Sequence, residues 1–292
     1  MIPKIIHYCW FGGKPFSPLA EECVKTWNRH VPEYEIKRWD ETNSPLDANP
    51  YIREAFQCRQ WAFVSDYVRF HALAEEGGIY LDTDMYLCRS LDPLREHRCF
   101  LGFEDSRHIN SLNSAIIGAV PEHRLIRDCL HYYARSVFNE TRPETVLRVV
   151  SPIIRSYGTV LPGVRQRIDD IELYPPSFFY PWPSEGYKQD TDFRKYMTRD
   201  SYTVHLWNKS WKTEFDFFRE GRFLDGLSLV VGKLKRNPFR PVSYYWRLAT
   251  YAARMPWFSL LATLKRKPKT TSEADDASSD AVESPPSPFT RR

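Results

Sequence analysis

The stretch Gly77-Gly78-Ile79-Tyr80-Leu81-Asp82-Thr83-Asp84 decides the fold prediction. Two glycines end the preceding segment, three apolar residues form a short strand pattern, and two aspartates follow directly. Side chains two positions apart on an extended backbone point to the same side, so the carboxylates of Asp82 and Asp84 are expected to converge. Two such carboxylates repel each other unless a proton or a cation lies between them.

A divalent cation suits this pair, because Mg²⁺ and Mn²⁺ prefer oxygen ligands and readily bridge to phosphate. The Asp-x-Asp motif is weak by itself, since a solvated turn accommodates two acidic residues equally well. The position of Asp82 and Asp84 directly after Gly-Gly and a buried strand places them at the end of a sheet. We therefore predict a metal-diphosphate site that holds Mn²⁺ or Mg²⁺.

The residues before this stretch predict alternating strands and helices. Ile2 to Trp10 is a strand pattern that ends at Phe11-Gly12-Gly13. Ser17 and Pro18 suit the start of a helix, and Tyr34 to Trp39 alternates like a strand. Residues 60–76 place apolar side chains on one helical face. This order predicts a layered α/β fold, in which ligands bind beyond the carboxyl ends of strands.

The charge distribution divides the chain into three parts. Apolar residues make up 42% of the 292 residues, which is enough for a large core. We expect a folded domain over residues 1–225, a basic amphipathic helical extension over 226–267, and a disordered tail over 268–292. The net charge of +4 conceals a run from Gly226 to Ser272 with ten Lys and Arg and no Asp or Glu.

The basic extension has no repeat and no zinc-ligand spacing, so we expect no nucleic-acid partner. A solvated pair of helices and a surface for anionic membrane explain it equally well. The six cysteines form no Cys-x-x-Cys pair, and the chain shows no apolar signal segment and no membrane-spanning run. We expect reduced thiols in the cytoplasm, with peripheral contact at the inner face of the membrane.

Asp66 and Arg69 lie three residues apart on the helix that precedes the Asp pair, on a face shared with Ala62 and Leu73. Apolar neighbours on that face indicate partial burial of both charges. An intrahelical ion pair is one interpretation. The alternative is that both side chains bind sugar hydroxyls beside the metal.

These segments together resemble the glycosyltransferases with a DXD sugar-binding motif. The resemblance rests on Ile2-Pro3-Lys4-Ile5-Ile6-His7-Tyr8-Cys9-Trp10-Phe11-Gly12-Gly13, Ser65-Asp66-x-x-Arg69 and the stretch from Gly77 to Asp84. The family includes fungal Golgi mannosyltransferases and bacterial capsule and lipopolysaccharide transferases, and clostridial toxin glucosyltransferase domains are more distantly similar. The resemblance implies an α/β fold of the GT-A type with a mixed central sheet and helices on both faces. It also implies a nucleotide-sugar donor, a divalent metal and retention of anomeric configuration.

The resemblance also suggests roles for individual residues. Trp10 would lie against the nucleotide base, and Asp66 and Arg69 would hold the donor sugar or ribose. Asp82 would contact the ribose or sugar and, through water, the metal. Asp84 would be the more direct metal ligand.

The strand pattern from Tyr202 to Trp207 contains His205. A lone histidine within a strand is usually a core residue with its hydrogen bonds satisfied. The resemblance favours it as the third metal ligand. In the loop that follows, Trp211 and Lys212 are expected to contact the donor diphosphate. Asn113 is expected near the donor or acceptor sugar.

We therefore expect a metal-dependent hexosyltransferase that uses a UDP- or GDP-linked sugar and a glycan or glycolipid acceptor, as in polysaccharide or lipopolysaccharide synthesis. A catalytically idle nucleotide-sugar-binding protein is a second interpretation. An Asp-dependent phosphatase of the haloacid type is a third, disfavoured because Tyr86 stands where a small β-branched residue is usual.

Overall fold

The computed structural model describes residues 1–104, 111–140, 142–184, 192–208, 212–236, 239 and 242–253. The chain divides into two compact units between Trp211 and Lys212. The first unit holds all the described strands, and the described part of the second is helical. This division lies earlier in the chain than the predicted boundary at 225/226.

The first unit is built around a seven-stranded sheet in the order β2-β1-β3-β6-β5-β8-β7. Strand β3 (Gly78–Leu81) runs parallel to β1 (Ile5–Cys9) and antiparallel to β6 (Leu112–Ala119). All residues of β3 and β6 are buried, as expected for strands covered on both faces. The other strands are β2 (Glu35–Trp39), β5 (Cys99–Phe103), β7 (Gln166–Ile168) and β8 (Ile171–Tyr174). The predicted α/β class with a mixed sheet is confirmed.

Gly77 and Gly78 turn the chain into the centre of this sheet. Both have positive φ angles, 63° and 105°, which glycine adopts readily. A Cβ atom on Gly77 would lie 2.6 Å from Cδ of Pro121, and one on Gly78 would lie 2.8 Å from the carbonyl oxygen of Ile5. Only glycine therefore fits the entry to β3.

The side chain of His7 ties the first three strands together. Trp39 donates from Nε1 to Nδ1 of His7 (3.1 Å), which leaves Nε2 to donate to the Gly77 carbonyl oxygen (2.7 Å). Burial lowers the pKa of His7, which matches this neutral tautomer.

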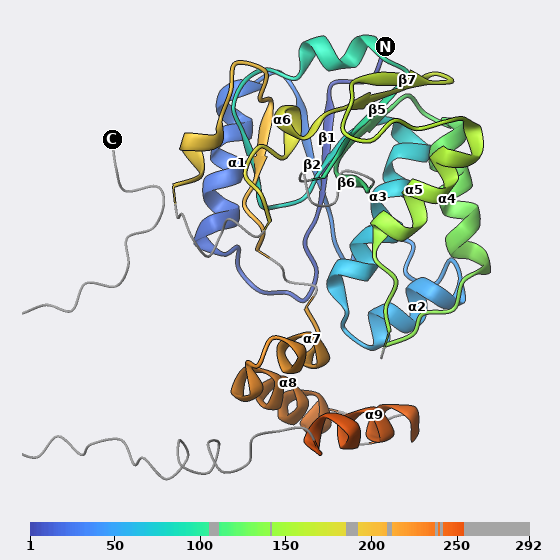
Figure 1. Ribbon diagram of the computed structural model, residues 1–292. Helices are drawn as coiled ribbons and strands as arrows, with labels where there is room; N and C mark the ends of the chain where they lie inside the picture. The colour runs from blue at the N-terminus through green and yellow to red at the C-terminus, as the bar shows by residue number, and fades with distance from the viewer. Residues whose placement is uncertain are drawn as a thin grey trace, which may run out of the picture. The chain divides into compact units, whose positions relative to one another are not determined.

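Helices cover both faces of the sheet, as predicted (Figure 1). Helices α3 (Trp61–Glu76), α4 (Arg124–Arg135) and α5 (Val146–Tyr157) lie on one side, and α1 (Pro18–His30) lies on the other. Ser17 Oγ accepts from the amide of Ala20 (3.2 Å) and caps α1, as its sequence predicts. Shorter helical segments are α2 (Pro50–Gln57), α6 (Pro176–Phe179) and the 3₁₀ turns Asp92–Glu96 and Phe193–Tyr196.

A separate two-stranded sheet pairs β4 (Met85–Leu87) with β9 (Thr203–His205). Helix α1 holds β4 in place through two buried hydrogen bonds. Trp27 Nε1 donates to the Met85 carbonyl (2.8 Å), and the Leu87 amide donates to Thr26 Oγ1 (2.9 Å). The strand predicted over 202–207 is confirmed as the shorter β9.

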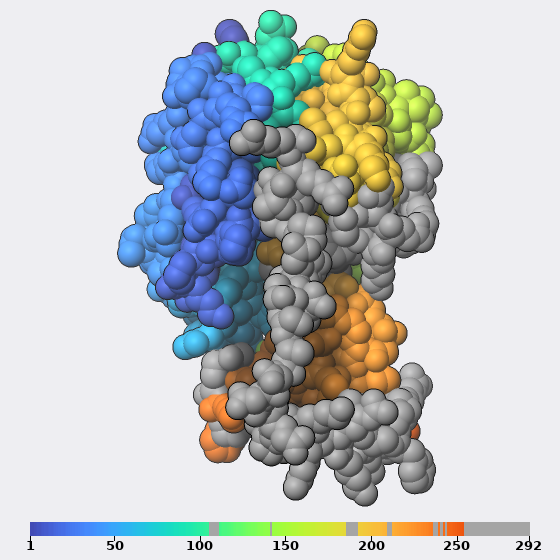
Figure 2. Space-filling view, turned by 90° about the vertical axis from the view of Figure 1, so that its left-hand side faces the viewer, coloured from blue at the N-terminus to red at the C-terminus, as the bar shows by residue number. Residues whose placement is uncertain are grey.

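The segments that flank this small sheet also meet at the surface. Arg89 donates to the carbonyl oxygens of Arg199 (2.8 Å) and Asp200 (3.0 Å). Figure 2 shows the teal segment near residue 90 beside the gold segment near residue 200. These bonds pin β9 against β4 from its amino-terminal side.

The second unit contains α7 (Glu214–Arg219), α8 (Phe223–Arg236) and α9 (Val242–Ala252). Its core consists of Phe215, Phe218, Val230 and Tyr244. Helix α8 begins three residues before the predicted extension. The predicted tail, 268–292, lies outside the described residues. No helix of the described ranges is long and apolar enough to cross a membrane.

The absence of a side chain at Gly118 is required by the packing of β6 on β5. A Cβ atom there would lie 2.2 Å from the ring of Phe100. We predict that Gly118→Ala lowers the free energy of unfolding by about 1–3 kcal/mol, measured by denaturant titration. Gly158→Ala is the matched control, because its Cβ would meet only ordinary contacts at 3.4 Å. Equal stability of the two variants would contradict this account.

Candidate metal and donor site

Asp82 and Asp84 lie where the chain leaves the central sheet for the small one. The Asp82 amide donates to the Ala115 carbonyl (2.8 Å), and the Met85 amide donates back to the Asp82 carbonyl (3.0 Å). Thr83 and Asp84 form a turn, not an extended strand. The carboxylates of Asp82 and Asp84 do converge, but the predicted cause, side-chain alternation on an extended strand, is wrong. They converge because a tight turn redirects the chain from β3 into β4.

His205 reaches this turn through the pairing of β4 with β9. Met85 lies opposite His205 in the register, and the Leu206 amide donates to the Asp84 carbonyl (2.9 Å). The side chains then meet, with His205 Nε2 3.2 Å from Asp84 Oδ1. The Asn208 amide donates to Asp84 Oδ2 (2.8 Å), so both oxygens of this carboxylate are oriented.

The three predicted metal ligands form one cluster. Atoms of Asp82, Asp84 and His205 lie within 4.8 Å of one another. Asp84 and His205 are buried, whereas the side chain of Asp82 is 28% exposed. Two carboxylates and one imidazole are a donor set that suits Mn²⁺ or Mg²⁺. The residues therefore fit a divalent cation that is reached from the side of Asp82.

The ring of His205 packs closely against that of Trp207 at an interplanar angle of 38°. Its centroid lies 4.0 Å from that of Trp207, and Trp207 Nε1 donates to the Trp182 carbonyl (2.8 Å). Nδ1 of His205 is buried and has no hydrogen-bond partner among the described residues. Its other nitrogen, Nε2, is the one directed at the carboxylates.

Electrostatic coupling links the three groups. Burial by itself would raise the pKa of Asp84, but His205 and the hydrogen bond from the Asn208 amide together outweigh it, so this pKa lies below its usual value. Burial by itself would lower the pKa of His205, but the negative charges of Asp84, Asp82 and Glu104 together outweigh it, so that pKa is raised. Burial also raises the pKa of Asp82, and Arg69 only partly offsets this. Asp84 and His205 therefore each favour the charged form of the other.

Arg69 is the second source of positive charge at the site. It is buried, and its Nη2 lies 2.7 Å from Asp66 Oδ1 and 3.3 Å from Asp82 Oδ1. Nη1 donates to the carbonyl (2.9 Å) and hydroxyl (3.2 Å) of Ser114 on β6. The intrahelical ion pair considered from the sequence is present, but it is buried and extends to Asp82. The role of Asp66 and Arg69 toward a sugar stays a prediction.

Tyr80 supports Asp82 from within β3. Its hydroxyl donates to Asp82 Oδ1 (3.0 Å), and Arg69 lies 4.5 Å from the centre of its ring. Asp82 Oδ1 therefore accepts a hydrogen bond from Tyr80 and forms an ion pair with Arg69. Tyr80 and Ser114 were not predicted as site residues, because their contacts depend on the pairing of distant segments.

A second group of buried polar residues lies where β5 and β6 meet. Asn113 donates from Nδ2 to Glu104 Oε2 (3.0 Å), and the Tyr180 hydroxyl donates to the Asn113 carbonyl (3.1 Å). The ring of Tyr180 lies edge-on to His205, with centroids 5.9 Å apart. Glu104 contributes to the raised pKa of His205 and so lies near the metal cluster. The structure thus brings Asn113 close to the site and adds Glu104 and Tyr180.

The other predicted donor contacts are less directly placed. Trp10 follows β1, donates from Nε1 to the Lys14 carbonyl (2.6 Å) and packs on Phe16. Lys212 belongs to the second unit, where its ammonium pairs with Glu220 at 2.5 Å. Trp211 lies outside the described residues. Contact of these three with a donor stays a prediction.

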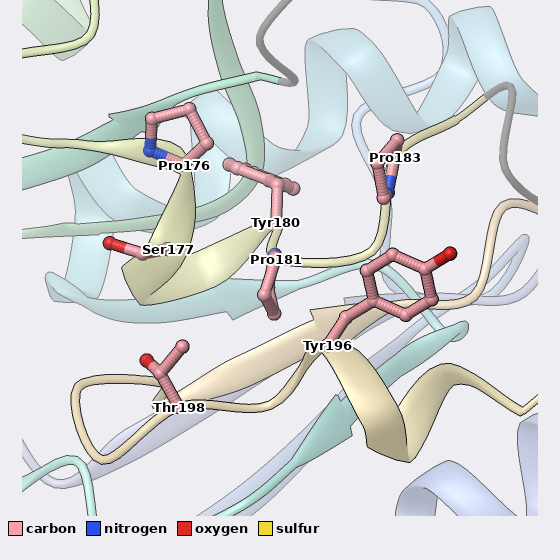
Figure 3. Close-up of a pocket in the computed structure, with 7 residues that line it drawn as sticks. All are labelled: Pro176, Ser177, Tyr180, Pro181, Pro183, Tyr196 and Thr198. Carbon is pink, nitrogen blue, oxygen red and sulfur yellow. The ribbon is translucent and has the colours of Figure 1, made fainter.

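Tyr180 also borders a cavity of about 200 Å³ (Figure 3). Pro181, Pro183 and Tyr196 line this cavity with it. Asp82, Asp84 and His205 are not among its lining residues. The cavity is therefore a neighbour of the metal cluster and not the cluster itself.

Two family models match successive parts of this chain. The glycosyltransferase sugar-binding region containing the DXD motif matches residues 18–101, and the alpha 1,4-glycosyltransferase conserved region matches residues 120–217. The first match contains Asp66, Arg69, Asp82 and Asp84, and the second contains His205. These two matches confirm the resemblance to the glycosyltransferases with a DXD sugar-binding region that the sequence predicts.

Several curated relatives and solved structures that this chain resembles carry names of glycosyl-transferring proteins. Lactosylceramide 4-alpha-galactosyltransferase of Mus musculus is 26% identical over 54% of this chain and 44% of that protein. Mannosyl phosphorylinositol ceramide synthase CSH1 of Saccharomyces cerevisiae is 27% identical over 45% of this chain and 36% of that protein. The chain thus spans less than half the length of these relatives. The galactosyltransferase LgtC, solved with donor and acceptor sugar analogs, gives a TM-score of 0.36 at 12% identity, covering 83% of this chain and 99% of that one.

Asp66 and Asp82 share the Arg69 guanidinium, and this arrangement predicts how the free energy of unfolding depends on pH. Burial raises the pKa of Asp66 to about 7, since Arg69 offsets it only in part and the nearby Asp82 carboxylate adds to the rise. When the pKa of an acid is higher in the folded state than in the unfolded chain, the folded state binds more protons at pH values between the two pKa values. The free energy of unfolding therefore falls as the pH rises through that range. We predict that the free energy of unfolding of the wild type falls, relative to Asp66→Asn, between about pH 4 and pH 7, by at most about 4 kcal/mol.

Denaturant titrations over this pH range, in buffer with a chelator, provide the measurement. Asp66→Asn retains an oxygen that accepts from Arg69 but cannot titrate. If the two proteins show the same pH dependence, Asp66 does not carry the raised pKa.

Proposed function

We propose that this protein transfers a hexosyl group from a UDP- or GDP-linked sugar to a hydroxyl of a glycolipid or other glycan, with retention of configuration. The observation that carries the proposal is the convergence of Asp82, Asp84 and His205 at the end of β3. The names of the two curated relatives, which refer to ceramide lipids, support a glycolipid acceptor. Synthesis of a cell-surface glycan, such as lipopolysaccharide, is one setting for this reaction.

A bound Mn²⁺ or Mg²⁺ would stabilise the charge that develops on the leaving diphosphate. Asp84 and His205 would hold the cation, and Asp82, fixed by Tyr80 and Arg69, would contact the sugar or ribose. The bond from the anomeric carbon to the diphosphate oxygen breaks as the acceptor oxygen attacks from the same face. The acceptor proton passes to the departing diphosphate.

This front-face route agrees with the state of the nearby carboxylates. Asp66 is engaged with Arg69, and Glu104 with Asn113. A double displacement would need one of them to leave these contacts and attack the anomeric carbon. We therefore favour the route without a protein nucleophile.

We also propose that the protein works in the cytoplasm. Cys9, Cys23, Cys99 and Cys129 are buried thiols that form no disulfide. Burial raises the pKa of the Cys9 and Cys88 thiols to about 12. Buried thiols that stay protonated are typical of proteins in a reducing compartment.

A thermal-shift panel of UDP- and GDP-sugars, each with and without Mn²⁺, identifies the donor. A bound donor raises the melting temperature by mass action, and the increase is expected only with metal. Stabilisation without any turnover on glycolipid or glycan acceptors would favour the idle binding protein. Phosphate release from simple phosphomonoesters would favour the phosphatase.

We predict that Asp84→Asn reduces Mn²⁺-dependent donor hydrolysis and transfer by about a hundredfold or more, because a ligand charge and an aligned oxygen are lost. Asp47→Asn is the matched control, since the Asp47 side chain is 92% exposed. Activity is measured as release of free nucleotide diphosphate. Full activity of Asp84→Asn would show that the proposed site is wrong.

A further inference from the structure

The outer side of α9 presents an apolar surface to solvent. Val242 is 73% exposed and Trp246 is 71% exposed. Tyr245 and Ala249 are also exposed and lie on the same side of the helix. At about 100° per residue, these four positions occupy an arc of about 100° on the helix. No charged side chain falls within that arc. We call these four residues the outer arc of α9.

The inner side of α9 already has its packing partners. Tyr244 is fully buried, Leu248 packs against the core of this unit, and Tyr251 packs on Phe215 and Phe218 of α7. Tyr244 and Tyr251 lie 5.6 Å from Phe215 between ring centroids. The core of the second unit therefore forms without the outer arc, which remains a separate apolar surface.

Further apolar side chains are exposed in the same unit. Phe239, between α8 and α9, is 89% exposed. On α8, Leu224 and Val231 are 46% and 50% exposed and lie two turns apart, and exposed Lys235 follows one turn later. A small helical unit that exposes this many large apolar side chains is typical of an interaction surface.

The charge of this region indicates the kind of partner. Gly226 to Ser272 contains ten Lys and Arg and no acidic residue. Beyond Ala253 the sequence continues with mostly apolar residues from Met255 to Leu264, and then Lys265-Arg266-Lys267-Pro268-Lys269. Apolar and aromatic residues combined with unopposed positive charge match an anionic lipid surface.

We propose that the outer arc of α9, together with Phe239, docks on an anionic phospholipid bilayer. The Trp246 and Tyr245 rings suit the interface between headgroups and acyl chains, where aromatic residues with one polar atom are favoured. Lys235 and the other basic residues of this region add attraction to the headgroups. The proposal does not depend on the donor site, but a protein held on a membrane would have direct access to a lipid-linked acceptor.

The test is flotation of the full-length protein with vesicles, without donor or metal. We expect binding to phosphatidylcholine vesicles that contain phosphatidylglycerol, weaker binding at high salt, and little binding to phosphatidylcholine alone. Trp246→Glu should reduce the partition coefficient about tenfold or more, because it removes buried apolar area and adds repulsion. Lys235→Glu should reduce it about fivefold or more, since each charge contributes about 1 kcal/mol.

Val137→Glu is the matched control, because Val137 is 72% exposed in the first unit. It should bind vesicles as the wild type does, and far-ultraviolet circular dichroism should confirm that all variants are folded. No binding to anionic vesicles, or equal binding by Trp246→Glu and Val137→Glu, would overturn the proposal. If Trp246→Glu instead converts a dimer to a monomer in lipid-free light scattering, with vesicle binding unchanged, the outer arc joins two copies of the chain.

Discussion

The concentration of negative charge at the carboxyl end of β3 is the constraint on which the site depends. Asp66, Asp82 and Asp84 lie close together and largely out of solvent. Among the described contacts of these three carboxylates, the basic partners are the Arg69 guanidinium and the His205 imidazole. Buried charges are destabilising unless they are paired, so each of these side chains is tied to its neighbours. A divalent cation beside Asp84 and His205 would relieve the repulsion that remains.

The fold meets this constraint by bringing four distant segments to one point. The two glycines turn α3 into β3, which places Arg69 behind Asp82. Helix α1 anchors β4, and β4 in turn sets the register of β9 that carries His205. Since α1 and β9 are far apart in sequence, the metal cluster can form only after the first unit has folded. The site is therefore a property of the tertiary structure and not of the Asp-x-Asp motif alone.

Local signals in the sequence were sufficient for much of the fold. The Ser17 cap, the Gly-Gly entry to β3 and the helical face over 60–76 depend on near neighbours, and they appear as predicted. Contacts between distant strands were not accessible in the same way. The sequence alone could not reveal that Ser114 accepts from Arg69, that Glu104 holds Asn113, or that Tyr180 lies against His205. His205 was predicted only because the family resemblance pointed to it.

The most direct test is a crystal structure of the protein with Mn²⁺ and whichever nucleotide diphosphate stabilises it, with anomalous diffraction at the manganese edge. The account predicts a manganese peak bonded to Asp84 and to His205 Nε2, with the diphosphate on the same ion and Asp82 beside it. A manganese ion bound elsewhere, or a diphosphate held without these residues, would contradict the central claim.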